Sequence, residues 1–184
     1  MQSVIYHLIV VIVAAFSTIV GFRRGLGRQT PSVIGLAFGI VCARLLSPGL
    51  DGVLYGAFPS VHGKVEERFL YDTLSSGLIF FSIYAIFRTL TGFLGKVLAS
   101  TSDSTILDNL AGSLFGLFKY MLFLSIVYNF LCGASPESEL RKCARSDDGN
   151  IVEEVMLLSP ALLGGEDVMD LSHKIQLEEA KKIS

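Results

Sequence analysis

Four long apolar stretches dominate the chain, and each is long enough to cross a membrane. They lie near residues 3–22, 30–47, 74–98 and 108–131. At ~1.5 Å per residue, about 20 helical residues cover a hydrocarbon layer of ~30 Å. The pattern therefore predicts an all-α integral membrane protein with four transmembrane helices.

Polar and helix-breaking residues separate the four spans. A short turn at residues 21–29 carries three arginines. Dense positive charge in an early loop favours a cytoplasmic location, which would place both chain termini outside. The Ser-Pro-Gly sequence at 47–49 is expected to end the second span. Residues 50–72 are then expected to form an extramembrane loop, and residues 100–105 a polar turn.

The composition changes after the fourth span. We therefore expect a membrane domain at residues 1–133 and an extramembrane tail at 134–184. Asn150 and Glu153 resemble a capping box, which predicts a short amphipathic helix in the tail. This helix would lie on the membrane surface or against the bundle, and it would break near Pro160. Its apolar face is expected to carry Ile151, Val155, Leu158 and Leu162.

Two pairs of glycines, each four residues apart, lie within the apolar spans. They are Gly35 with Gly39 in the second span, and Gly112 with Gly116 in the fourth. Such a step places both glycines on one helix face, where a second backbone can approach closely. We expect the two glycine faces to pack against each other. Gly92 and Gly95 in the third span lack this step and are expected to tolerate alanine better.

A few charged residues interrupt or border the apolar runs. Arg88 and Lys119 lie within them, and Asp108 opens the fourth. A charge at membrane depth is costly unless it faces protein or water. The two cations are expected to reach toward the interface or to bond inside the bundle, and Lys119 meeting Asp108 of a neighbouring chain is a further alternative. A small oligomeric transporter or channel built on these charges stays the alternative function.

Composition and missing motifs narrow the functional classes. Charged residues make up 17% of the chain, below the ~25% of soluble domains. The net charge of −2 and the lack of a basic, aromatic-rich cluster argue against nucleic-acid binding. The three cysteines form no Cys-x-x-Cys pair near a histidine, so neither a metal nor a cofactor is expected. No catalytic motif occurs, which favours a non-enzymatic protein.

Two sequence motifs together resemble those of the colicin V production protein (CvpA) family. The first is the turn Gly21-Phe22-Arg23-Arg24-Gly25 after the first span. The second runs from Leu107-Asp108 through Gly112 and Gly116 at the start of the fourth span. The chain departs from the family pattern at two positions, where Lys119 replaces the usual arginine and Tyr120 the following glycine.

The resemblance implies a multi-pass protein of the bacterial inner membrane. Members of this family are needed for colicin V production or export, a step in toxin biosynthesis. Their wider role is tied to envelope homeostasis. By this resemblance we expect the chain to lie in the lipid bilayer and to act through protein partners in the cell envelope. Formation of a homo-oligomer stays open.

Overall fold

The computed structural model describes residues 2–57, 65–97, 105–134 and 150–165, with single positions at 140, 170, 173, 174 and 177. Within these residues the chain is helical, as expected. Four of its helices are long and apolar enough to cross a membrane. The elements are α1 (Gln2–Arg24), the short 3-10 helix η1 (Gly27–Gln29), α2 (Thr30–Ala57), α3 (Val65–Val97), α4 (Ile106–Ala134) and α6 (Ile151–Leu163).

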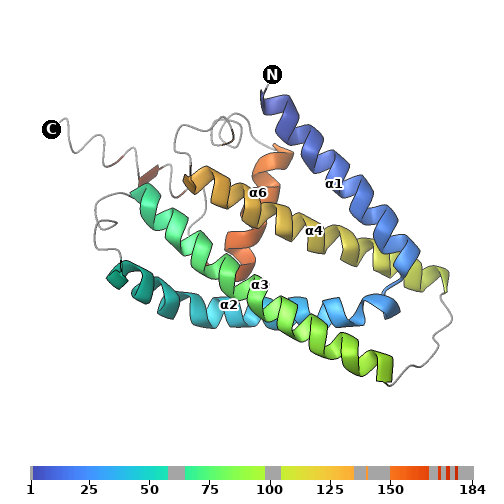
Figure 1. The fold of residues 1–184 in the computed structure, drawn as a ribbon. Helices are drawn as coiled ribbons and strands as arrows, with labels where there is room; N and C mark the ends of the chain where they lie inside the picture. Colours follow the sequence, from blue (N-terminus) through green and yellow to red (C-terminus); the bar gives the residue numbers. More distant parts are fainter. Residues whose placement is uncertain are drawn as a thin grey trace.

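The long helices form two pairs joined by α4 and α6. Helix α1 lies along α4, α2 lies along α3, and the short α6 crosses between the pairs (Figure 1). One buried cluster draws mainly on α1, α4 and α6. A second draws on α2 and α3, again with α4 and α6. Because α4 and α6 contribute to both clusters, they hold the two pairs together.

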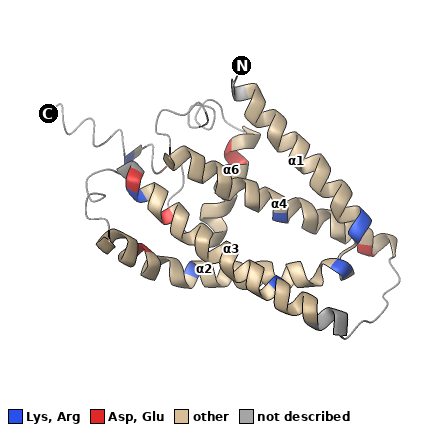
Figure 2. Cartoon of the chain, viewed as in Figure 1, with Lys and Arg blue, Asp and Glu red and all other residues tan. Residues whose placement is uncertain are grey.

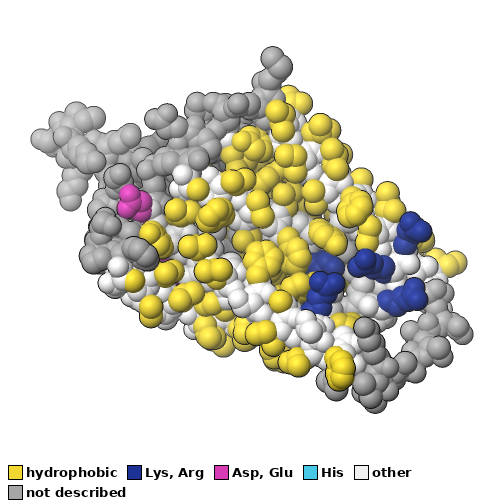
Figure 3. All heavy atoms as spheres, in the orientation of Figure 1, with side chains coloured by type: hydrophobic (Ala, Val, Ile, Leu, Met, Phe, Trp, Pro, Cys, Tyr) yellow, Lys and Arg dark blue, Asp and Glu magenta, His cyan; other side chains and the backbone are white. Residues whose placement is uncertain are grey.

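Helix α4 is the most buried of the four candidate spans. In its most apolar window 44% of residues are buried, against 17% for α1. The outer surfaces of the long helices carry exposed apolar side chains, such as Leu8, Leu45 and Leu114. Charges are sparse along these helices (Figure 2), and hydrophobic atoms cover much of the face in Figure 3. This distribution is that of a bundle whose outer surface faces lipid.

The predicted end of the second span at residue 47 is wrong. Helix α2 continues through Pro48 to Ala57. Proline removes one helical hydrogen bond, but contacts with α3 hold the turns that follow. Ser75 donates a hydrogen bond to Asp51, and the Tyr55 hydroxyl donates to the Asp72 carboxylate.

Helices α2 and α3 take up most of the expected loop at 50–72. Helix α3 begins at Val65 rather than at residue 74, with Glu67 in its first turn, where the helix dipole favours negative charge. Helix α4 exceeds its predicted bounds at both ends. Residues 58–64, the 100–104 turn and most of the tail after 165 lie outside the described residues.

The predicted helix break at Pro160 is also wrong, because α4 replaces the hydrogen bond that proline removes. Pro160 has no N–H to donate to the carbonyl of Met156. Two α4 side chains donate to that carbonyl instead, Asn129 Nδ2 at 2.7 Å and Ser125 Oγ at 3.1 Å. Helix α6 therefore runs on to Leu163, packed against the bundle.

The start of α6 agrees with the predicted cap, whereas its predicted apolar face is rotated. Asn150 accepts a hydrogen bond from the Val152 amide at 3.0 Å. Ile151, expected on the buried face, is half exposed. The side chains that α6 buries are Val152, Val155, Met156, Ser159 and Leu163.

Arg44 holds the other end of α6. Its guanidinium donates a hydrogen bond to the Ala161 carbonyl at 3.2 Å. A cation at a helix C-terminus also interacts favourably with the helix dipole. Helix α2 thereby helps to fix α6 between the two pairs.

Candidate functional site

The two motifs singled out in the sequence meet at one end of the bundle. Asp108, at the start of α4, binds the turn that connects α1 to α2. Its carboxylate Oδ1 accepts a hydrogen bond from the Gly27 amide at 2.8 Å, and its backbone carbonyl accepts one from the Leu26 amide at 3.0 Å. The turn is therefore anchored to α4, 81 residues further along the chain.

Gln29 completes this anchor from inside the turn. Its Nε2 donates to the carbonyls of Gly25 and Gly112 at 3.1 Å each, and it lies 3.3 Å from the carbonyl of Gly21. Only 5% of the residue is exposed. Sequence reasoning passed over Gln29, because nothing in a polar turn marks which amide is buried.

Glycines allow the turn and α4 to approach at backbone distance. A Cβ at Gly112 would lie 2.6 Å from the Gly21 oxygen and 2.6 Å from the Gly25 carbonyl carbon. Gly25 itself has a φ of 68°, in the left-handed region that favours glycine. A side chain at Gly112 would push the two backbones apart, and one at Gly25 would displace the Asp108 carboxylate.

Both glycine pairs lie at close helix contacts, but the predicted contact between them is wrong. Gly116 packs on α1, where its Cβ would lie 2.8 Å from the Ser17 carbonyl oxygen. Gly35 and Gly39 pack on α3, with the Tyr84 carbonyl oxygen 2.9 Å from a Cβ at Gly35. A glycine face permits a close approach without specifying which helix makes it.

The intramembrane cations lie apart from Asp108, whose carboxylate serves the turn. Lys119 is 5% exposed, and its Nζ lies 4.8 Å from the ring centre of Tyr120 and 5.7 Å from that of Phe115. Lys119 and Tyr120, the two residues that depart from the family pattern, therefore contact each other. Arg88 is exposed and lies over the Tyr84 ring at 5.9 Å.

The arginines of the turn are exposed, unlike the buried Lys119. Arg23 and Arg24 are exposed at the end of α1, beside the buried Gly21 and Gly25. The alternating burial follows from the turn itself, because its glycines face α4. The turn therefore presents positive charge on a backbone that Asp108 and Gln29 hold in place.

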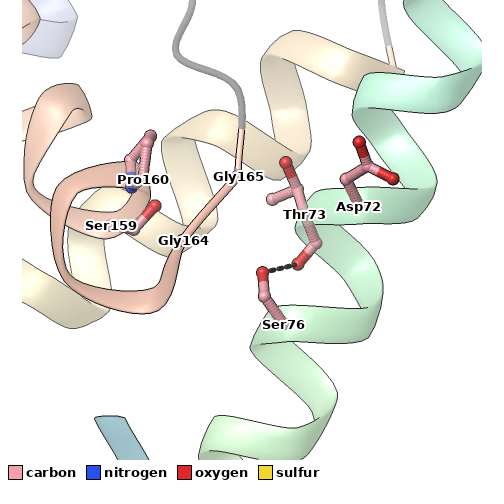
Figure 4. A pocket seen from close by; sticks show the side chains of 7 residues that line it. All are labelled: Asp72, Thr73, Ser76, Ser159, Pro160, Gly164 and Gly165. Carbon is pink, nitrogen blue, oxygen red and sulfur yellow. Dashed lines mark hydrogen bonds between the residues drawn. The ribbon is translucent and has the colours of Figure 1, made fainter. Parts of the chain in front are cut away.

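A second polar cluster, not predicted from the sequence, joins α4 to α6. Ser125, Asn129 and Ser159 are all buried, and the Ser159 amide donates to Ser125 Oγ at 2.8 Å. A nearby hollow separates the end of α6 from Asp72, Thr73 and Ser76 of α3 (Figure 4). Its volume of about 10 Å³ has room for about one water molecule, so this cluster joins helices rather than binding an organic ligand.

The fold and this anchored turn define a multi-pass, all-α membrane protein. The colicin V production protein family matches residues 6–155. That range contains the turn, α1 from Tyr6 onward, the whole of α2, α3 and α4, and the start of α6. The chain therefore belongs to the colicin V production protein family. No curated protein and no solved structure shows significant similarity to it.

Proposed function

We propose that this chain is a non-enzymatic protein of the bacterial inner membrane that supports colicin V production or export, and envelope homeostasis, through protein partners. The observation that carries the proposal is the family match, which spans both halves of the anchored turn. The exposed arginines on a fixed backbone support a binding role. In the proposed orientation the turn faces the cytoplasm and both termini lie outside.

Complementation tests this function. A colicin V-producing strain that lacks its own family member would receive this chain, and secreted toxin activity would be measured. We expect secretion to be restored. Failure of the properly inserted chain to restore secretion or envelope integrity would contradict the proposal.

Partner capture tests the mechanism in the same cells. A photoreactive amino acid at Arg23 or Arg28 of the turn should crosslink to a defined envelope protein. The matched control is Val53, an exposed apolar residue near the far end of α2. Equal capture from the turn and from position 53 would argue against a specific partner at the turn.

A small oligomeric transporter or channel is the second candidate. It is favoured by the buried Lys119 and by an open hollow of about 470 Å³ beside Arg88. Purified protein in vesicles distinguishes the two functions. Conduction predicts anion flux that falls in Lys119→Gln/Arg88→Gln, whereas the proposed partner-dependent function predicts no flux through either protein.

A further inference from the structure

Helix α6 ends inside the bundle, between the two helix pairs (Figure 1). Leu163, its last residue, belongs to the same buried cluster as Phe80 and Leu122, which lie near the middle of α3 and α4. Arg44, which bonds to the Ala161 carbonyl, is likewise near the middle of α2. The C-terminal end of a short helix therefore lies at membrane depth.

This helix end presents backbone carbonyls that need partners. The last four carbonyls of an α-helix have no donor within the helix. Two of them are bonded here, one to the Gly164 amide and one to the Arg44 guanidinium. The other two, those of Leu162 and Leu163, receive no hydrogen bond within the described part of the chain. Backbone groups at membrane depth must be satisfied by protein, water or an ion.

A small polar hollow separates this helix end from α3 (Figure 4). Two hydroxyls in its wall are buried, since Ser76 is 6% exposed and Ser159 5%. Ser76 donates its hydrogen to the Thr73 carbonyl, and Ser159 Oγ accepts one from Asn129, both at 3.2 Å. Each hydroxyl oxygen therefore keeps a lone pair for a ligand. The full lining is Asp72, Thr73 and Ser76 from α3, with Ser159, Pro160, Gly164 and Gly165.

The charge around the hollow suits a monovalent cation. The C-terminal end of α6 carries the negative end of the helix dipole. Asp72 is the one carboxylate in the lining, and it also accepts a hydrogen bond from the Tyr55 hydroxyl at 2.5 Å. A divalent cation usually takes more carboxylates, and the described residues contain no group of three or more His, Cys, Asp or Glu side chains. Arg44, the nearby cation, is bonded to the Ala161 carbonyl.

We propose that this hollow binds a sodium ion between α3 and the C-terminal end of α6. Ser76, Ser159 and Asp72 supply side-chain oxygens to the ion. The volume of about 10 Å³ has room for a single particle, so the ion binds without its hydration shell. In transporters, the C-terminal ends of broken helices coordinate sodium at membrane depth in this way. The site lies apart from the anchored turn and goes beyond the function proposed above.

The test measures sodium binding to the purified full chain in a neutral detergent. Binding of radioactive sodium is measured directly, and thermal unfolding is compared in sodium, potassium and choline chloride at equal ionic strength. We expect sodium to bind and to raise the unfolding midpoint above that in choline chloride. Asp72→Asn and Ser76→Ala should each weaken sodium binding about tenfold, the effect of losing one interaction with a charged group.

Asp51→Asn is the matched control. Asp51 is a carboxylate on α2 that accepts a hydrogen bond from Ser75, but it does not line the hollow. Its variant should bind sodium nearly as tightly as the unmodified protein does. Because Ser76 donates to a carbonyl of its own helix, Ser76→Ala keeps the test valid even where Asp72→Asn fails to fold.

Three results would overturn the proposal. Equal unfolding midpoints in sodium and choline chloride would show that the hollow holds only water. An equal loss of sodium binding in Asp51→Asn would show a general effect of charge rather than a site in the hollow. Potassium binding as tightly as sodium would overturn the choice of ion.

Discussion

Gly112→Ala should destabilise the protein by about 3 kcal/mol or more, one of the largest effects expected of a single methyl group here. The added Cβ would lie 2.6 Å from the Gly21 oxygen and 2.8 Å from the Gly25 Cα. Both contacts are with backbone atoms, which cannot rotate away as a side chain can. The turn would have to move away from α4.

That movement would also weaken the hydrogen bonds that anchor the turn. The Leu26 backbone amide would separate from the Asp108 carbonyl, and the Gln29 side-chain amide would separate from the Gly112 carbonyl. The measurement is reversible unfolding in mixed detergent micelles. Gly92→Ala is the control, because open space surrounds Gly92 and alanine in a helix gains up to ~1 kcal/mol over glycine. Equal stability of the two variants would show that the turn is not closely packed on α4.

Asn129→Leu should have the second large effect, a loss of ~2 kcal/mol. It removes the shorter of the two hydrogen bonds to the Met156 carbonyl, which Pro160 leaves without a helical donor. Leucine also removes an unpaired acceptor, since Asn129 Oδ1 has no partner among the described residues. Removing this unpaired oxygen stabilises the variant, so the net loss of unfolding free energy stays near the lower end of the range for losing a buried, hydrogen-bonded side chain.

Pro160→Ala should reduce this loss by about 1 kcal/mol, because alanine returns an N–H to the Met156 carbonyl. The unmodified protein, both single variants and the double variant would be unfolded under the same conditions. The cycle isolates the coupling between positions 129 and 160 from any general loosening of the core. Strictly additive losses would show that α4 does not compensate for the proline.

The helical class and the four spans could be predicted because apolar length alone determines them. The ends of the helices were harder, since tertiary contacts decide them. Pro48 and Pro160 both carry a local signal for a helix break. Helix α2 continues past its proline because Asp51 and Tyr55 form hydrogen bonds with Ser75 and Asp72 of α3. Helix α6 continues because α4 side chains donate to its Met156 carbonyl. Neither partner can be identified from local sequence.

The parts of the candidate site could be found in the sequence, but their arrangement could not. The glycine steps and Asp108 stand out as unusual residues at the ends of apolar runs or within them. Their partners lie on other helices, so that Gly112 meets the turn rather than Gly35. Gln29 and Asn129 carry much of the buried hydrogen bonding, yet one polar amide in a sequence resembles any other until its burial is known.

Crosslinking in native membranes tests most directly that the turn is anchored on α4. Leu26→Cys and Asn109→Cys would be combined after replacing Cys42, Cys132 and Cys143 with alanine, and a short thiol-specific crosslinker added. The Leu26 amide lies 3.0 Å from the Asp108 carbonyl, so we expect efficient crosslinking within one chain. The control pairs Leu26→Cys with Val53→Cys, near the far end of α2. Crosslinking at 26 and 109 no greater than in this control would contradict the anchored turn.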